Sequence, residues 1–188
     1  MNAGQNKILP SYVVRKLVED EHVKSFNCGD ADLNDFILRE ASAYHKALLA
    51  VTYVYETECD KKVIAYFSLA NDRISLTDFR DKSAFNRFRK HRFINEKRLK
   101  GYPAAKICRL AVCNELQKQH IGERIINFIK SYFQVNSRIG CRFLTVDAYS
   151  GAVPFYLKNG FIPLGKEEKE SPTRLMFFDL ASLKPQTE

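Results

Sequence analysis

The hydrophobic positions along the chain follow two different periods, which predicts strands interspersed with helices. Short runs of β-branched and aromatic residues predict strands at 12–18, 50–55, 63–69, 106–112, 143–148, 161–164 and 175–180. Apolar residues spaced by three and four predict helices over 31–46, over about 14 residues from Ile121, and over 152–159. Alternating strands and helices are typical of an α/β fold with a mixed sheet.

The order of these elements also predicts how the chain is organised. The strand, helix and strand between 106 and 148 should form a right-handed parallel unit. A length of 188 residues fits one domain, which we expect to span 1–188. A basic insert at about 77–105 precedes the parallel unit, and a tail at about 182–188 is expected to fray.

Composition narrows the class of protein. Hydrophobic residues make up 45% and charged residues 28%, as in globular proteins. No apolar run reaches the roughly 18 residues of a membrane span, and 1–10 lacks the apolar segment of a secretion signal. The five cysteines are odd in number and form no Cys-x-x-Cys pair, and the four histidines lack metal-ligand spacing. We therefore expect reduced thiols, no metal, no membrane and a cytoplasmic location.

The positive charge is concentrated in one segment. The net charge is +8, and 82–100 alone contributes +7, from eight bases and one acid. Phe85, Phe88 and Phe93 are interleaved with these bases. Such a segment attracts a polyanion or the phosphates of a cofactor.

Two segments carry candidate chemistry. At 109–122 a buried strand leads through a polar loop into a helix, whose first N–H groups and dipole form an anion cradle suited to a pyrophosphate. Gly122 would let the backbone approach such a ligand closely, although many α/β domains have a glycine there without a ligand. In the second segment, Tyr156 has a phenol of acidity close to that of a thiol, so it is a candidate proton donor to a thiolate. The alternative is a tyrosine that packs in the core and hydrogen bonds through its hydroxyl.

Together the two segments resemble the GNAT superfamily of acyl-coenzyme A-dependent N-acyltransferases. The phosphate loop of that family reads Gln/Arg-x-x-Gly-x-Gly/Ala, and 117–122 reads Gln-Lys-Gln-His-Ile-Gly, with His120 where glycine is usual. The Phe-Tyr-x-x-x-Gly-Phe element of the family is present at 155–161. The resemblance implies the GNAT fold: a single mixed, mostly antiparallel, twisted sheet of about seven strands flanked by helices. That sheet would be splayed between the strands at 106–112 and 143–148.

The resemblance also implies a binding mode for acetyl-coenzyme A as co-substrate, without a metal. The pantetheine arm would bond to the strand backbone, and the pyrophosphate to amides of the loop and first helical turn. The residues expected to bind the cofactor are Leu110, Ala111, Val112, Gln117, Lys118, Gln119, His120, Ile121, Gly122, Glu123, Arg124 and Phe155. Tyr156 carries over as the general acid for the departing thiolate, with direct attack of the amine and no covalent enzyme intermediate. A non-glycine residue at His120 requires either a negative φ or tolerated strain.

A narrower resemblance concerns the acetyltransferase toxins of bacterial toxin–antitoxin pairs, over about 9–164. It rests on 26–36, 63–69 and 108–112. Those toxins acetylate the amino group of aminoacyl-tRNA and pair with small ribbon-helix-helix antitoxins. This chain differs in its longer basic connection.

The basic connection has two interpretations. In one, Arg87, Arg89, Lys90 and Arg92 neutralise tRNA phosphates, and the interleaved phenylalanines stack on exposed bases. In the other, it is a solvated basic helix whose phenylalanines pack on the sheet.

The sequence thus predicts an acetyl-coenzyme A-dependent N-acetyltransferase, with aminoacyl-tRNA as the favoured acceptor. An enzyme that acts on a small amine, a protein N-terminus or a lysine is the alternative within the class. A non-catalytic module that binds coenzyme A or nucleic acid is the alternative outside it, motivated by His120 in the phosphate loop. Whether the chain forms a homodimer is left open.

Overall fold

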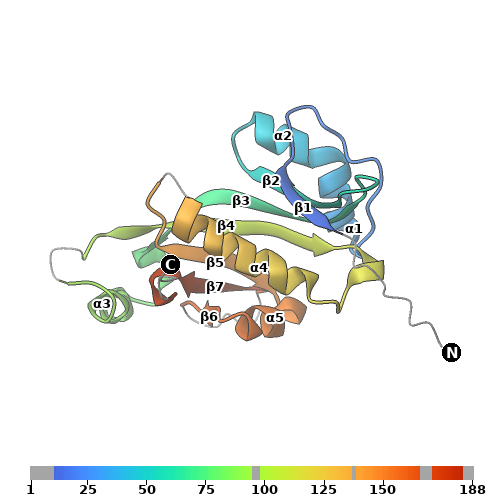
Figure 1. Cartoon of the computed structure of the whole chain (residues 1–188). Coiled ribbons are helices and arrows are strands. Elements are labelled where there is room, and N and C mark those ends of the chain that lie inside the picture. Colours follow the sequence, from blue (N-terminus) through green and yellow to red (C-terminus); the bar gives the residue numbers. More distant parts are fainter. Residues whose placement is uncertain (1–10, 95–97, 137–138, 166–170, 184–188) are drawn as a thin grey trace. The chain divides into compact units, whose positions relative to one another are not determined.

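The computed structural model describes residues 11–94, 98–136, 139–165 and 171–183 (Figure 1). The chain contains two compact units. The N-terminal unit comprises the described residues up to Ser68 together with Arg109–Ile121. The C-terminal unit comprises Leu69–Cys108 and the described residues from Gly122 onward. The single domain expected over 1–188 therefore contains two units.

Seven strands form one mixed sheet in the order β1-β2-β3-β4-β5-β7-β6. The strands are β1 (Tyr12–Lys16), β2 (Val51–Thr57), β3 (Val63–Ser75), β4 (Gly101–Val112), β5 (Phe143–Tyr149), β6 (Ile162–Pro163) and β7 (Thr173–Asp179). β1 pairs antiparallel with β2, and β7 pairs antiparallel with both β5 and β6. β4 and β5 are parallel. The predicted mixed α/β sheet and its parallel unit are confirmed.

The predicted helices are also present. They are α1 (Ala31–Asp35), α2 (Ala41–Lys46), α3 (Lys82–Lys90), α4 (Ile121–Ser131) and α5 (Val153–Lys158). A π-helical turn at Phe36–Glu40 joins α1 to α2, so the helix predicted over 31–46 is one segment with a wide turn in its middle. Asp30 caps α1 as expected, because its carboxylate accepts a hydrogen bond from the Leu33 amide at 3.0 Å.

The N-terminal unit has its own core beside β2 and β3. Phe36 of the π-helical turn stacks on Tyr66 of β3, with ring centroids 6.0 Å apart. Phe26 meets the same tyrosine edge-on at 5.3 Å. The Tyr66 hydroxyl donates to the Leu33 carbonyl at 2.6 Å, which ties α1 to the strand. This cluster fixes the segment that precedes α1.

In the C-terminal unit, the pairing of β4 with β5 is short. The parallel register joins Ala104–Lys106 to Phe143–Thr145. Within this unit β4 continues to Cys108 and β5 to Tyr149 beyond that register. The register therefore ends where the sequence predicted that the strands splay.

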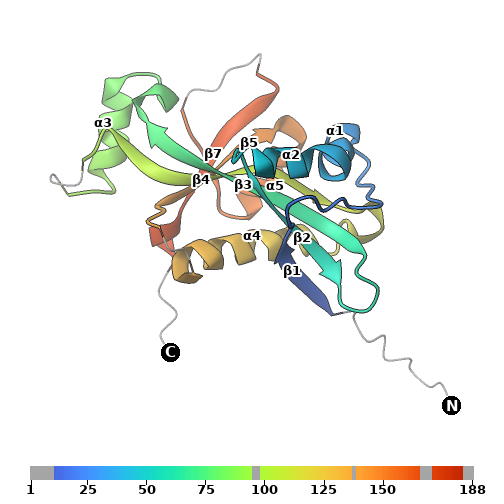
Figure 2. The ribbon, with the colours of Figure 1, turned by 90° about the horizontal axis from the view of Figure 1, so that it is seen from above.

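Two helices of the C-terminal unit occupy different places (Figures 1 and 2). α4 runs alongside β5, whereas α3 lies at the end of the sheet where β3 ends and β4 begins. α3 buries Phe85 and Phe88 in a cluster with Tyr102, Phe143 and Phe177. α4 buries Ile125, Ile126 and Ile129. The amphipathic pattern of α4 predicted this buried face.

The strands on either side of α3 are longer than the sequence predicted. β3 extends to Ser75 through the polar residues Asn71–Arg73, and β4 begins at Gly101 rather than at 106. Polar residues at the end of β3, and Gly101 and Pro103 at the start of β4, disfavoured a strand prediction for segments that are paired within the sheet. The insert between strands is correspondingly shorter than 77–105. At the C-terminus, a 3-10 turn ends at Ser182, and 184–188 of the expected frayed tail lie outside the described residues.

Candidate functional site

In the N-terminal unit, the end of β4 and the loop after it are fixed by hydrogen bonds. The Cys113 amide donates to the Ile64 carbonyl at 2.8 Å, and the Asn114 amide donates to the Asn27 carbonyl at 3.0 Å. The Gln117 side-chain amide donates to the carbonyls of Cys28 at 2.8 Å and Val112 at 3.1 Å. The side chain of Gln117 is therefore a brace for the loop, and its backbone amide donates to the Asn114 carbonyl at 3.4 Å.

The loop contains two residues in the left-handed region. Lys118 has a φ of +62° and His120 a φ of +61°. This conformation costs a non-glycine residue about 1–2 kcal/mol. Of the two possibilities that the sequence left for His120, the structure shows the strained one. Alternation into the left-handed region turns successive N–H groups toward a common concavity, the geometry that binds anions.

In the C-terminal unit, Gly122 lies against Phe155. A Cβ atom at Gly122 would approach the Phe155 ring to 3.2 Å. The absence of a side chain at Gly122 thus lets α5 pack against the first turn of α4. This is a packing reason for the glycine, in addition to the close approach of a ligand that the sequence suggested.

Tyr156 is nearly buried, with 6% of its surface exposed. Its ring meets Phe155 and Phe161 edge-on, at 5.1 and 5.3 Å. Within the described ranges its hydroxyl has no hydrogen-bond partner, unlike the satisfied core tyrosine that was the alternative. Burial raises the pKa of Tyr156 well above its ordinary value. The phenol therefore keeps its proton at neutral pH, but it is a weaker acid than the reference value used in the sequence argument.

A buried lysine that the sequence argument missed holds the end of α5. The Lys130 ammonium donates to the Asn159 carbonyl at 2.7 Å and lies 3.9 Å from the centroid of the Phe178 ring. The Asn159 side chain in turn donates to the Phe155 carbonyl at 2.9 Å. Lys130 directly follows Ile129 on the buried side of α4, which is the one signal that the sequence offered. Its contacts fix the helix that carries Tyr156.

The basic segment divides into exposed and structural cations. Arg87 and Lys90 are exposed on α3. Arg89 donates to the carbonyls of Arg98 and Leu99 at 3.2 and 3.3 Å. Arg92 lies 4.3 Å from the Phe88 ring centroid and pairs with Asp179 at 3.5 Å. Of these four cations, Arg87 and Lys90 are the exposed ones, and they are available for a polyanion.

The phenylalanines of that segment do not form an exposed stacking platform. Phe85 and Phe88 are buried, 4% and 8% exposed. Phe93 stacks on Tyr102, with centroids 4.0 Å apart and planes 5° from parallel. The interpretation as a helix that packs its phenylalanines on the sheet is therefore correct, and base stacking by these three rings is wrong. Helical spacing alone did not reveal which face of α3 the sheet covers.

Several expectations concern cysteines, metals and membranes. All five cysteines are free, and Cys113 is buried. Among the described residues, no cluster of histidine, cysteine, aspartate or glutamate has the makings of a metal site. Nor does any helix in those ranges combine the length and apolar character that crossing a membrane requires.

The chain was compared with protein families and with curated proteins. Residues 91–176 match a family described as the acetyltransferase (GNAT) domain. A search of curated proteins found no match.

Solved structures with a similar fold include bacterial toxins. A tyrosine-to-phenylalanine mutant of KacT has a TM-score of 0.70 at 20% identity and covers 91% of this chain and 96% of its own. AtaT in complex with acetyl-methionyl-tRNAfMet has a TM-score of 0.70 at 23% identity, covering 92% and 96%. A structure described as a bacterial toxin has a TM-score of 0.74 at 13% identity, covering 93% of both chains. At these identities the likeness shows a shared fold.

The family match includes the two segments that the sequence singled out. It begins before β4 and ends in β7, so it contains the phosphate loop and α5. The single mixed sheet of seven strands and the parallel pairing of β4 with β5 agree with the fold that the sequence predicted. Residues 91–176 are thus similar to an acetyltransferase (GNAT) domain, and the whole chain shares the fold of the solved toxins.

Proposed function

We propose that the protein transfers the acetyl group of acetyl-coenzyme A to the amino group of aminoacyl-tRNA. The observation that carries the transferase assignment is the GNAT match over 91–176, which spans the loop with left-handed Lys118 and His120 and the helix of Tyr156. The acceptor is supported by the fold shared with AtaT, a protein whose structure holds acetyl-methionyl-tRNAfMet. AtaT has also been solved with acetyl-coenzyme A and the C-terminus of its antitoxin AtaR.

The residues present fit the proposed co-substrate. Backbone groups of Leu110, Ala111 and Val112 would bond to the pantetheine arm. The amides from Gln117 to Arg124 would hold the pyrophosphate, because α4 has eleven residues and its first N–H groups carry the positive end of the dipole. Phe155 would contact the cofactor from α5. Fixed loop geometry, held by Gln117, lowers the entropic cost of ordering these amides on binding.

The proposed reaction is a direct displacement. The neutral α-amine, whose ordinary pKa is about 8, attacks the thioester carbonyl. The new C–N bond forms as the C–S bond breaks, and the amine releases one proton to solvent. Tyr156 donates its proton to the departing thiolate, and the resulting phenolate regains a proton from solvent, which balances the proton released by the amine. The hydroxyl is protonated and has no partner among the described residues, so it is available as a donor, although burial makes it a weaker acid than a free phenol.

Replacement of Tyr156 by phenylalanine tests this role. We expect kcat to fall by about 10²-fold or more, the scale of a lost general acid, with an unchanged KM for acetyl-coenzyme A. Because the hydroxyl makes no internal hydrogen bond within the described ranges, folding stability should be retained. Unchanged kcat would remove Tyr156 from the mechanism.

The acceptor is tested with labelled acetyl-coenzyme A. Total charged tRNA, deacylated tRNA and a mixture of polyamines and peptides are offered in parallel. Label on charged tRNA alone supports the proposed acceptor. Label in the amine mixture alone favours a small-amine or protein acetyltransferase. If acetyl-coenzyme A binds but no acceptor releases free thiol, the non-catalytic module is the correct reading.

The exposed bases of α3 test the tRNA surface. The triple variant K82Q/R87Q/K90Q should reduce the slope of log KM against log salt by about 2–3, because each phosphate contact contributes about 0.7–0.9. A control triple variant of exposed bases in the N-terminal unit, K16Q/K24Q/R39Q, should leave that slope unchanged. Equal slopes in both variants would place the tRNA elsewhere. A ribbon-helix-helix antitoxin and a homodimer are further proposed partners, testable by co-purification with the adjacent gene product and by light scattering.

A further inference from the structure

One face of the sheet in the C-terminal unit changes character along its strands. On β5, alternate residues share a face, so Phe143, Thr145 and Asp147 point the same way. Phe143 belongs to the cluster under α3. The next positions are polar: Asp147 forms an ion pair with Lys106 of β4, and Thr145 donates a hydrogen bond to Asp72 of β3. A polar sheet face beyond the cover of α3 indicates a surface that meets water or a polar ligand.

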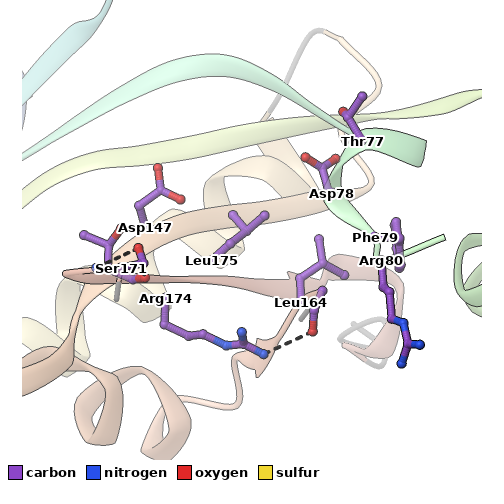
Figure 3. Close-up of a pocket in the computed structure, with 11 residues that line it drawn as sticks. Thr77, Asp78, Phe79, Arg80, Asp147, Leu164, Ser171, Arg174 and Leu175 are labelled. Carbon is purple, nitrogen blue, oxygen red and sulfur yellow. Dashed lines mark hydrogen bonds between the residues drawn. The ribbon is translucent and has the colours of Figure 1, made fainter. Parts of the chain in front are cut away.

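This polar floor lines a pocket of about 530 Å³ (Figure 3). Asp147 and Leu175 form one side, and Thr77 and Asp78 stand on the other. A recess of about 140 Å³ shares Asp78 and Asp147 and reaches Asp72, Lys106 and Thr145. The recess therefore lies where the register of β4 with β5 ends.

The charges in the pocket leave two carboxylates available. Asp78 accepts hydrogen bonds from the Ser75 amide at 2.6 Å and the Ser75 hydroxyl at 3.4 Å. Asp72 accepts from Thr145 and from the Arg73 amide at 2.8 Å. Among the described residues, neither carboxylate forms an ion pair, although the charge of Asp72 acts on Lys106 in the same recess. Both carboxylates can therefore attract an ammonium group or accept from hydroxyls.

A second pocket, of about 390 Å³, adjoins the first beside α3. The residues that line it are Phe79, Arg80, Ala84, Arg87, Phe88, His91 and Gly165. Two rings and a methyl group form its apolar part, while Arg80, Arg87 and His91 are exposed. An apolar slot beside the exposed guanidinium groups of Arg80 and Arg87 is complementary to a planar aromatic ring that bears an anionic group.

The wall shared by the two pockets is closely packed. Phe79, Arg80 and Gly165 line both pockets. Gly165 has a φ of +72°, and a Cβ atom there would lie 2.4 Å from the Asp78 carbonyl oxygen. Arg174 donates to the Gly165 carbonyl at 3.2 Å. The two segments are thus in backbone contact, which fixes the distance between the pockets.

We infer that the two pockets bind the aminoacylated 3′-terminal nucleotide of the acceptor, with the amino acid over the carboxylates and the base beside α3. The inference rests on the proposed function and names the residues that would read the acceptor. The amino group lies toward Asp72 and Asp78, at the end of the β4–β5 register. The base packs against Phe79 and Ala84, and the adjacent phosphate meets Arg80, Arg87 and His91. In the ligand, the ammonium group lies at one end and the base and phosphate at the other, with the ribose between them. In the protein, the carboxylates lie on one side of the shared wall, and the apolar slot with its basic side chains lies on the other.

Binding of a stable analogue tests this inference without the acetyl-transfer step. The probe is 3′-(methionylamino)-3′-deoxyadenosine 5′-monophosphate, titrated by calorimetry into the full chain, with AMP and methioninamide as part ligands. Arg87→Gln should weaken both the analogue and AMP by about tenfold, through loss of a charge-assisted bond to phosphate. Lys90→Gln is the matched control, because Lys90 is exposed on the same helix but does not line the pocket, and it should change neither affinity.

Two further variants address the two ends of the ligand. Asp78→Asn keeps an acceptor for the Ser75 amide, and it should weaken the analogue about fivefold or more while leaving AMP unchanged. Ala84→Leu fills the slot beside α3, and it should abolish AMP binding and leave methioninamide unchanged. Absence of analogue binding at millimolar concentration, or equal losses in Arg87→Gln and Lys90→Gln, would overturn the inference.

The outcomes separate this inference from the proposed function. If charged tRNA is acetylated but the analogue binds independently of Arg87 and Asp78, the pocket assignment alone is wrong. If the analogue binds as described but charged tRNA receives no label, the pockets stand and the acceptor of the reaction is wrong.

Discussion

The Asp179 carboxylate binds two arginines, Arg142 and Arg92, that lie over phenylalanine rings of the segment containing α3. Its carboxylate accepts a bidentate pair of hydrogen bonds from Arg142, at 2.7 Å from Nε and 3.0 Å from Nη2. It also pairs with Arg92 at 3.5 Å. Arg92 and Arg142 lie over Phe88 and Phe93, at 4.3 and 4.8 Å from the ring centroids. Replacement of Asp179 by alanine therefore leaves two partly buried guanidinium groups without their carboxylate.

The magnitude of the loss follows from burial. The Asp179 side chain is 18% exposed, and those of Arg142 and Arg92 are 29% and 25% exposed. Exposed ion pairs contribute about 0–1 kcal/mol, whereas removal of one partner of a buried pair costs about 3–5 kcal/mol. This site lies between these limits, so Asp179→Ala should lower the free energy of unfolding by about 2–3 kcal/mol. Burial lowers the pKa of Arg92, whereas the charge of Asp179 raises it, so replacement of Asp179 removes the interaction that offsets burial.

Urea unfolding followed by circular dichroism measures this loss. The midpoint should fall in Asp179→Ala with little change in slope, and Asp179→Asn should lose less because its oxygen still accepts from Arg142. Arg39→Ala is the control: its pair with Asp35 is equally short, 2.7 Å, but the two side chains are 78% and 44% exposed. We expect a change of at most about 0.5 kcal/mol there. Equal losses at Asp179 and Arg39 would refute the argument from burial.

Three further predictions concern single positions. The hydrogen bond from Arg15 lowers the pKa of Glu21 below its ordinary 4.5. The stability contributed by this pair is therefore lost as the pH falls through the lowered pKa. Thermal melts of Arg15→Gln and the parent should differ at pH 7 and converge in strong acid. His120→Gly should retain stability, whereas His120→Val should lose about 1 kcal/mol or more at a φ of +61°, measured by urea unfolding. Equal midpoints for these two variants would contradict the strained conformation. Burial lowers the pKa of Lys130 below its ordinary 10.5. Between the lowered and the ordinary pKa the unfolded chain binds more protons, so the stability of the parent should rise with pH in that range. Lys130→Met should show no such rise in thermal melts across the same range.

The periodicity of the sequence determined most elements of the fold. Ile121, Ile125 and Ile129 repeat at helical spacing and lie buried on α4, as predicted. The parallel pairing of β4 with β5 followed from a strand, a helix and a strand in succession. The π-helical turn at 36–40 and the extensions of β3 and β4 did not follow, because pairing within a sheet stabilises polar strand residues whatever their propensity.

The candidate site was only partly visible in the sequence. Motif spacing placed the loop at 117–122 and Tyr156 in a family, because short stretches of chain carry those patterns. The sequence did not show that Gln117 braces the loop or that Lys130 supports α5. Those contacts join residues far apart along the chain, and such contacts leave no local periodicity.

The basic segment best separates the properties that the sequence determines from those that the tertiary structure determines. The sequence determined its charge, its helix and the amphipathic repeat of Phe85 and Phe88. Only the tertiary structure decided which cations face solvent, because the face of α3 that meets the sheet buries both phenylalanines and engages Arg92 with Asp179. Charge and periodicity are properties of the chain itself, whereas burial and counterion pairing depend on which elements pack together. The same packing brings Asp72, Asp78 and Asp147 from separate segments to the polar end of the sheet.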